Sequence, residues 1–132
     1  MARGMYVLLI TLDKLQKIPF GKKNIHNFKP GFYAYVGSAL NNLEKRIERH
    51  RSRQKNLHWH IDYFLNHAEI IDVITKETDK RIECDVSKKI GEICDNKVKG
   101  FGCSDCSCDS HLFYFKENPI EKIKKIIKVI FI

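Results

Sequence analysis

The segment GFYAYVGSALNNLEKRIERH, residues 31–50, decides the fold that the sequence predicts. Apolar residues alternate with tyrosines in its first part, a period of two that is typical of a β-strand with one apolar face and one face of phenols. Gly37 then breaks the strand. A helix is expected from residue 41 to about residue 52, because Asn41 or Asn42 suits a helix N-cap and apolar residues recur four apart beyond it.

This strand and helix bring a phenol close to two basic side chains. Tyr35 lies near the strand end, while Arg46 and His50 lie one turn apart on the helix. Phenols and a fixed guanidinium fit poorly in a hydrophobic core and fit well around a phosphate. The alternative is that Arg46 is an ordinary arginine on a helix surface, which is also the simpler interpretation of Arg49 and Arg53.

The composition predicts a single domain, residues 1–132, with a positively charged surface. Apolar residues make up 43% of the chain, which excludes wholesale disorder. The chain has 24 Lys and Arg against 16 Asp and Glu, a formal charge of +8 that favours nucleic acid as a partner, with a merely solvated lysine-rich surface as the alternative. No apolar run approaches the ~20 residues of a membrane span, and no signal peptide is recognised, so a cytoplasmic protein with no membrane partner is expected.

The remaining elements complete an α+β pattern. Residues 4–12 are apolar on both faces and predict a central strand that pairs with residues 31–37 as an antiparallel hairpin. Helices are expected within residues 58–70 and 81–96 and after Pro119, and strands at residues 69–76 and 111–115. The expected fold is a small, mostly antiparallel central sheet of about three to four strands flanked by helices.

The connection at residues 13–30 is basic and is interrupted by prolines and a glycine. It contains Lys22 and Lys23. A hairpin extension that touches a nucleic-acid backbone and a simple solvated loop explain this pattern equally well.

Together these motifs resemble the GIY-YIG nuclease superfamily. The resemblance rests on GMY at residues 4–6, YVG at residues 35–37, and the pair Arg46 and His50. That family is a small α/β domain that cleaves nucleic-acid phosphodiesters with one divalent metal ion. It implies that Arg46 contacts the scissile phosphate and offsets charge in the transition state.

The same resemblance implies the other catalytic roles. Tyr6 or Tyr35 would orient or deprotonate the attacking water. His50 and one of His58 or His60 would support these groups by hydrogen bonds. The family holds Mg²⁺ or Mn²⁺ with one glutamate near a helix start, a context that Glu83 fits better than Glu77 or Glu92. The catalytic residues expected on this basis are Tyr6, Tyr35, Arg46, His50, His58 and Glu83.

A second group of residues lies at 100–111, GFGCSDCSCDSH. Thiolates and imidazole are the ligands that Zn²⁺ prefers. Four ligands within nine residues would strain a tetrahedron, so at most three are expected from this loop, with His58 or His60 completing the set. The alternative is that these cysteines are only small residues in a glycine-rich turn.

This loop, together with YVGSA, HWHIDYFL and the pair Glu83–Cys84, resembles an archaeal branch of the superfamily known chiefly as an uncharacterised domain. The branch is sometimes fused to a DNA-repair glycosylase-like endonuclease, which implies a functional link to a repair enzyme. Its recurring positions suspected of binding metal match Cys106, Cys108 and His111, whereas Cys103 matches a position that is commonly not cysteine.

The leading hypothesis is therefore a metal-dependent endonuclease that acts on DNA, with Mg²⁺ or Mn²⁺ and a possible Zn²⁺ ion. DNA is expected ahead of RNA, although no residue chooses between them. The residues expected to contact nucleic acid are Lys22, Lys23, Arg49 and Arg53. The alternatives are a nucleic-acid-binding module without catalysis and an interaction domain whose Cys/His loop docks a partner enzyme.

Overall fold

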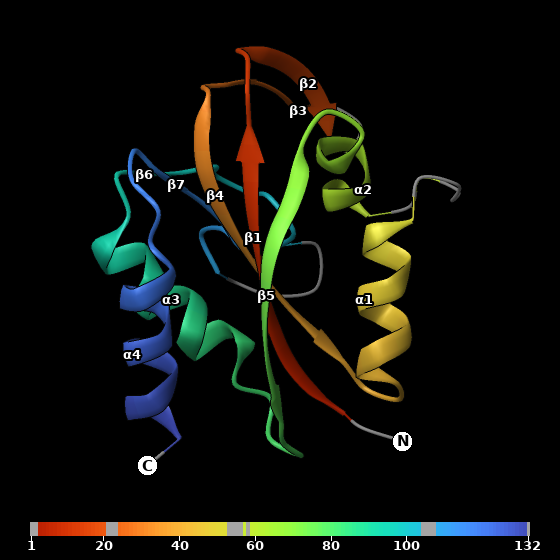
Figure 1. Cartoon of the computed structure of the whole chain (residues 1–132), viewed down its shortest axis with the longest axis vertical. Coiled ribbons are helices and arrows are strands. Elements are labelled where there is room, and N and C mark those ends of the chain that lie inside the picture. The colour runs from red at the N-terminus through yellow and green to blue at the C-terminus, as the bar shows by residue number, and fades with distance from the viewer. Residues whose placement is uncertain (1–2, 21–23, 53–56, 58, 104–107, 132) are drawn as a thin grey trace.

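A computed structural model describes residues 3–131 except 21–23, 53–56, 58 and 104–107 (Figure 1). Its strands are β1 (Gly4–Leu12), β2 (Gln16–Phe20), β3 (Asn24–Phe28), β4 (Gly31–Ala39), β5 (Glu69–Glu77), β6 (Asn96–Lys97) and β7 (Leu112–Phe115). Its helices are α1 (Leu43–Arg51), α2 (His60–Leu65), α3 (Glu83–Ile93) and α4 (Ile120–Ile130). None of these described helices is long and apolar enough to cross a membrane.

The main sheet has five strands in the order β5-β1-β4-β7-β6, and its neighbouring strands pair antiparallel. The α+β class and the antiparallel β1–β4 pair are confirmed, but the expected three to four strands were too few. β6 was missed because its two residues are too short to show a period. In the β1–β4 ladder Tyr6 lies opposite Gly37, so the GMY and YVG motifs are neighbours in space.

The sheet separates two hydrophobic cores, because successive side chains of a strand point to opposite faces. Ala34 and Val36 pack with residues of α3 and α4, whereas Tyr33 belongs to the core under α2 and the β2–β3 hairpin. Figure 1 shows α3 and α4 on one side of the sheet and α1 and α2 on the other. The expectation that phenols of this strand avoid the core is wrong for Tyr33, which is 2% exposed. Its hydroxyl donates a hydrogen bond to the Lys29 carbonyl at 2.7 Å, which satisfies the polar atom.

The connection at residues 13–30 forms the separate β2–β3 hairpin. Ile18, Phe20 and Phe28 are all buried, and the Phe28 ring centroid lies 4.8 Å from that of Phe64 on α2. The hairpin therefore covers one core, and the alternative of a solvated loop is wrong for its described residues. Lys22 and Lys23 lie outside the described residues.

Local signals fix where the helices begin. The Asn42 side chain accepts a hydrogen bond from the Lys45 amide at 3.1 Å, so Asn42 is the N-cap of α1. α3 begins at Glu83, as expected. Pro119 is the N-cap residue of α4, so this helix begins directly after Pro119, as expected. α2 ends at Leu65 and is shorter than expected.

Candidate active site

A cleft of about 610 Å³ brings together residues from both tyrosine motifs, α1, the start of α2, the start of α3 and the loop before β7. The expected site residues that line it are Tyr6, Tyr35, Arg46, His60, Glu83 and His111. The sequence did not indicate two further lining residues, Trp59 and Arg81. His58 lies outside the described residues.

Tyr6 lines the cleft and is in polar contact with His50. The Tyr6 hydroxyl lies 2.6 Å from His50 Nε2, and both residues are buried. Burial raises the pKa of Tyr6 to about 12, and the positive charge of Arg46 partly opposes this rise. Burial also raises the pKa of Tyr35, with the nearby Tyr6 adding to the effect. Both phenols are therefore neutral at pH 7.

The glycines of the two motifs are required by close approach of neighbouring groups. A Cβ at Gly37 would overlap the Tyr6 hydroxyl and Cζ. A Cβ at Gly4 would overlap the backbone carbonyl of Lys76 on β5. Gly37 therefore leaves the space in which the Tyr6 ring lies across β4, and Gly4 lets β1 approach β5.

Arg46 is held in the cleft wall by two contacts. Its Nη1 donates a hydrogen bond to the Ser38 carbonyl at 2.9 Å. Its guanidinium carbon lies 4.4 Å from the ring centroid of Trp59, within the range of a cation–π contact. A planar guanidinium fixed in this way is prepared to bind an anion without first losing side-chain freedom.

Arg49 has a different, more structural environment. Its guanidinium donates two hydrogen bonds, of 2.9 and 3.0 Å, to the carboxylate of Asp62. Asp62 is fully buried and also accepts a hydrogen bond from the Trp59 amide at 2.8 Å. The Arg49 guanidinium carbon lies 4.2 Å from the Trp59 ring centroid, so both arginines contact this indole. Contact of Arg49 with nucleic acid stays a prediction, and Arg53 lies outside the described residues.

Glu83 is the carboxylate that the fold brings to the cleft. It is the first residue of α3, is partly exposed and lines the cleft, whereas Glu77 and Glu92 are exposed residues of β5 and the far half of α3. A single carboxylate is a weak ligand for Mg²⁺, which keeps most of its waters and takes substrate oxygens as further ligands. The cleft, of about 610 Å³, has room for a cation with its waters and a phosphate group, and Glu83 could serve as the single carboxylate ligand of such a hydrated cation.

A cluster of metal-ligand types adjoins this carboxylate. The side-chain ligand atoms of Cys84, Cys108 and His111 all lie within 4.8 Å of one another. These residues could hold a metal ion, and two of them were expected from the sequence. Cys84 was missed as a ligand because it lies on α3, 24 residues before Cys108; its position after Glu83 was the available signal. Cys106 lies outside the described residues.

The described ligand cluster does not include His60, whose Nδ1 accepts a hydrogen bond from the Gly102 amide at 2.9 Å. Its role as a further ligand stays a prediction. His111 is buried, its Nδ1 lies 2.8 Å from Ser87 Oγ, and burial lowers its pKa although the charge of Glu83 acts in the opposite direction. The imidazole is therefore neutral at pH 7, the form that binds metal ions.

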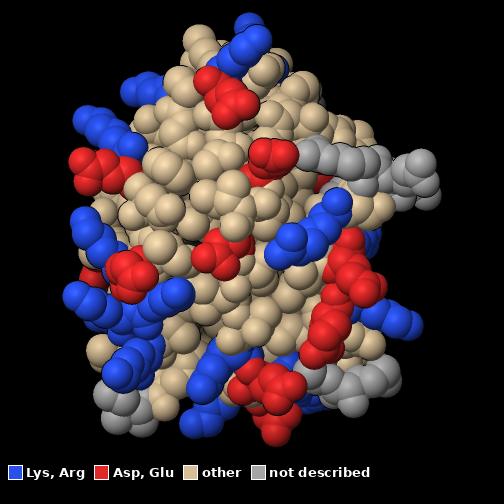
Figure 2. Space-filling model, in the orientation of Figure 1, with Lys and Arg blue, Asp and Glu red and all other residues tan. Residues whose placement is uncertain are grey.

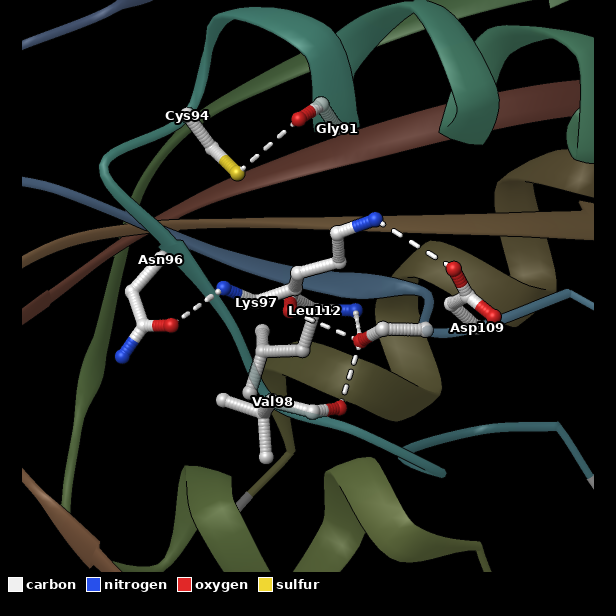
Figure 3. Close-up of polar contacts among 8 residues, drawn as sticks. Gly91, Cys94, Asn96, Lys97, Val98, Asp109 and Leu112 are labelled. Carbon is white, nitrogen blue, oxygen red and sulfur yellow. Dashed lines mark hydrogen bonds and ion pairs between the residues drawn. The ribbon is translucent and has the colours of Figure 1, made fainter.

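Contacts of Asp109 and Ser110 hold the segment that carries Cys108 and His111, and Figure 3 shows the contact between Asp109 and Lys97. Lys97 Nζ lies 3.3 Å from an Asp109 carboxylate oxygen, and the Ser110 hydroxyl donates to the Val98 carbonyl at 2.6 Å. The His111 amide donates to the Phe101 carbonyl at 2.9 Å. These bonds fix the backbone on which two of the three ligands lie.

Comparison with known proteins adds one finding. A family model described as a domain of unknown function, DUF123, matches residues 5–131, which include every residue of the cleft named above. No curated protein and no solved structure matches the chain.

Proposed function

We propose, from the premise that the chain belongs to the DUF123 family, that it hydrolyses phosphodiester bonds of nucleic acid with a divalent cation. The observation that carries the proposal is the meeting of Tyr6, Arg46 and Glu83, from β1, α1 and α3, in one cleft. A phenol, a guanidinium and a carboxylate supply a water-orienting group, an anion-binding group and a cation ligand. The resemblance of the two tyrosine motifs to the GIY-YIG nucleases supports the same assignment.

Arg46 would bind the scissile phosphate. Its bond to the Ser38 carbonyl uses one of the five N–H donors of a guanidinium, and the planar group suits two phosphate oxygens at once. Charge builds up on these oxygens during displacement, so a positive group already in place stabilises the transition state more than the substrate. Arg81, also in the cleft lining, would add positive charge near the same anion.

Tyr6 and His50 would handle the proton of the attacking water. A phenol with a pKa of about 12 is a poor base at pH 7, so Tyr6 would not start as a phenolate. Its hydroxyl is in hydrogen-bond contact with His50 Nε2 at 2.6 Å. The Tyr6 oxygen can accept a proton from the attacking water while the Tyr6 hydroxyl proton passes to His50 Nε2. Tyr6 then stays neutral, and the water is activated.

Glu83 would hold Mg²⁺ or Mn²⁺, which when bound polarises the phosphate and assists the leaving oxygen. The neighbouring thiolates and imidazole are a ligand set for softer ions and are not expected to hold Mg²⁺. We assign DNA ahead of RNA as substrate on the resemblance alone. The excess of positive charge supports a polyanionic substrate of either kind.

The test is cleavage of a panel of labelled DNA and RNA structures, single-stranded, duplex and branched, with Mg²⁺ or Mn²⁺. Glu83→Gln and Arg46→Lys should each lower the rate by roughly 100-fold or more. Glu92→Gln is the matched control, because Glu92 is an exposed glutamate of the same helix. Its Oε1 lies 3.9 Å from Lys89 Nζ, which is an ordinary surface ion pair. The proposal is refuted if the wild-type protein cuts no member of the panel, or if Glu83→Gln cuts as fast as Glu92→Gln.

A binding module without catalysis is a second candidate, favoured by the basic face of α4. Lys122, Lys124, Lys125 and Lys128 are exposed, while Ile123 and Ile127 face the core. Figure 2 shows basic side chains gathered along the edge where α3 and α4 lie, with acidic groups between them. This candidate predicts binding that weakens steeply with salt, does not require divalent cations and falls when the α4 lysines are replaced by glutamine.

A further inference from the structure

We propose that Cys84, Cys108 and His111 bind one Zn²⁺ ion, which ties the first turn of α3 to the segment before β7 and is separate from the cation at Glu83. The proposal rests on the position of the three ligand atoms and does not depend on the nuclease reaction. The sequence predicted up to three ligands from the loop at residues 100–111, with His58 or His60 completing the set. The proposed set instead takes Cys84 from α3.

The ligand chemistry selects the ion. Two thiolates and one imidazole suit Zn²⁺, a borderline-soft ion, whereas Mg²⁺ and Mn²⁺ take oxygen ligands. Zinc bonds of 2.0–2.3 Å at tetrahedral angles place the ligand atoms about 3.5–3.8 Å apart. The three ligand atoms lie within 4.8 Å of one another, so each pair needs to approach by at most about 1 Å to reach these separations. Small side-chain rotations are sufficient for such a movement.

The ligands come from elements that are already held in place. Cys84 lies in the first turn of α3, one residue after Glu83. The His111 amide donates to the Phe101 carbonyl at 2.9 Å, and the His111 carbonyl accepts from the Val36 amide of β4 at 3.0 Å. A rigid frame of this kind lowers the conformational entropy lost when a metal binds.

Ser87 supplies the kind of outer contact that accompanies a ligating histidine. Its hydroxyl lies 2.8 Å from His111 Nδ1, and both residues are buried. A histidine that binds metal through Nε2 usually hydrogen-bonds through its other ring nitrogen, which fixes the ring orientation and the tautomer. Ser87 belongs to α3 as Cys84 does, so this one helix orients two of the three ligands.

The proposed ion would stabilise the start of α3. The N-cap residue of α3, Ile82, makes no side-chain capping hydrogen bond, so the helix start lacks this usual source of stability. A metal bond to Cys84 would fix that turn to the sheet through His111. The ion would therefore stabilise the fold and hold the backbone from which Glu83 reaches the cleft.

The test measures metal content and does not measure cleavage. The full chain, purified without a metal-binding tag, should retain about one zinc per chain after dialysis. Cys84→Ser and Cys108→Ser should lose this zinc. Cys94→Ser is the matched control, because Cys94 is the C-cap residue of α3 and does not belong to the ligand cluster. Its Sγ donates a hydrogen bond to the Gly91 carbonyl at 3.3 Å (Figure 3). The Cys94→Ser variant should keep the zinc of the wild-type protein.

Cobalt substitution in the wild-type chain keeps the test decisive if a variant fails to fold. Co²⁺ bound by two thiolates gives a sulfur-to-metal charge-transfer band and strong tetrahedral visible bands, and added Zn²⁺ should remove both. The proposal is overturned if the wild-type chain binds neither ion, or if Co²⁺ binds without a sulfur band. It is equally overturned if Cys84→Ser keeps its zinc while Cys106→Ser loses it, since the ligands would then come from the loop alone.

Discussion

Replacing Gly37 by alanine should destabilise the protein, although alanine is ordinarily more favourable than glycine inside a strand. The added Cβ would overlap the Tyr6 hydroxyl and Cζ. β4 cannot move away easily, because Gly37 lies in the β1–β4 ladder and the neighbouring Val36 amide donates a hydrogen bond to the His111 carbonyl at 3.0 Å. The Tyr6 ring must therefore shift and its contact with His50 must lengthen or break.

The magnitude follows from three contributions. Insertion of a methyl group into a packed site costs about 1–3 kcal/mol. Loss of the buried hydrogen bond between Tyr6 and His50 costs about 1 kcal/mol. Removal of a strand glycine returns about 0.5–1 kcal/mol. Gly37→Ala should thus lower the free energy of unfolding by about 2 kcal/mol, or the melting temperature by about 8 °C.

Urea unfolding followed by tryptophan fluorescence measures this change. Trp59 is the only tryptophan, and its ring centroid lies 5.9 Å from that of His50, so the signal reports on the affected region. Gly91→Ala is the matched control, because Gly91 lies inside α3 and its Cβ would make no overlap: the nearest atoms are Phe113 Cε1 at 3.3 Å and Lys97 Nζ at 3.9 Å. Equal stability of the two variants would refute the role assigned to Gly37.

Three further outcomes are expected. Asp62→Ala should lower the free energy of unfolding by about 3 kcal/mol in urea titrations, because the bidentate bond to Arg49 is lost; the exposed Asp72→Ala should change it little. Phe28→Ala should cost about 3–5 kcal/mol by the same assay, because this fully buried ring joins the hairpin to α2. Burial raises the pKa of Tyr6 in the folded state to about 12, above the ordinary tyrosine value of about 10. The neutral Tyr6 therefore contributes to the free energy of unfolding fully below about pH 10, and this contribution is lost as the pH rises toward 12. The melting temperature should therefore fall less steeply with pH above pH 10 for Tyr6→Phe than for the wild-type chain. Equal slopes of melting temperature against pH would contradict the assigned burial of Tyr6.

Much of the fold followed from local sequence signals. The uninterrupted apolar run of β1 and the alternation in β4 predicted their pairing, because these patterns depend only on which faces are covered. The sequence did not decide between a hairpin and a solvated loop at residues 13–30, because the apolar residues there are few. Only their contact with Phe64 and Phe101 shows that they belong to the core. β6 carries no pattern of its own.

The sequence predicted those residues of the candidate site that lie close together in one motif. It did not predict those that come from segments far apart along the chain. Arg46 and His50 share a helix, so their spacing placed them together. Cys84 and His111 are far apart along the chain, and only the packing of α3 on the sheet brings their ligand atoms together. The role of Trp59 was missed for the same reason, because its contacts with both guanidiniums depend on the packing of two separate segments.

Because alternate residues of β4 belong to different cores, a slip of this strand by one residue against β1 would exchange its two faces. The phenols would then turn toward α3 and α4, and Ala34 and Val36 would lie under α2, so that one core would be overfilled and the other would contain cavities. Insertions in members of the family should therefore fall outside the strands, between β2 and β3 or after α1, and the number of residues from the YVG motif back to the start of β4 should stay constant.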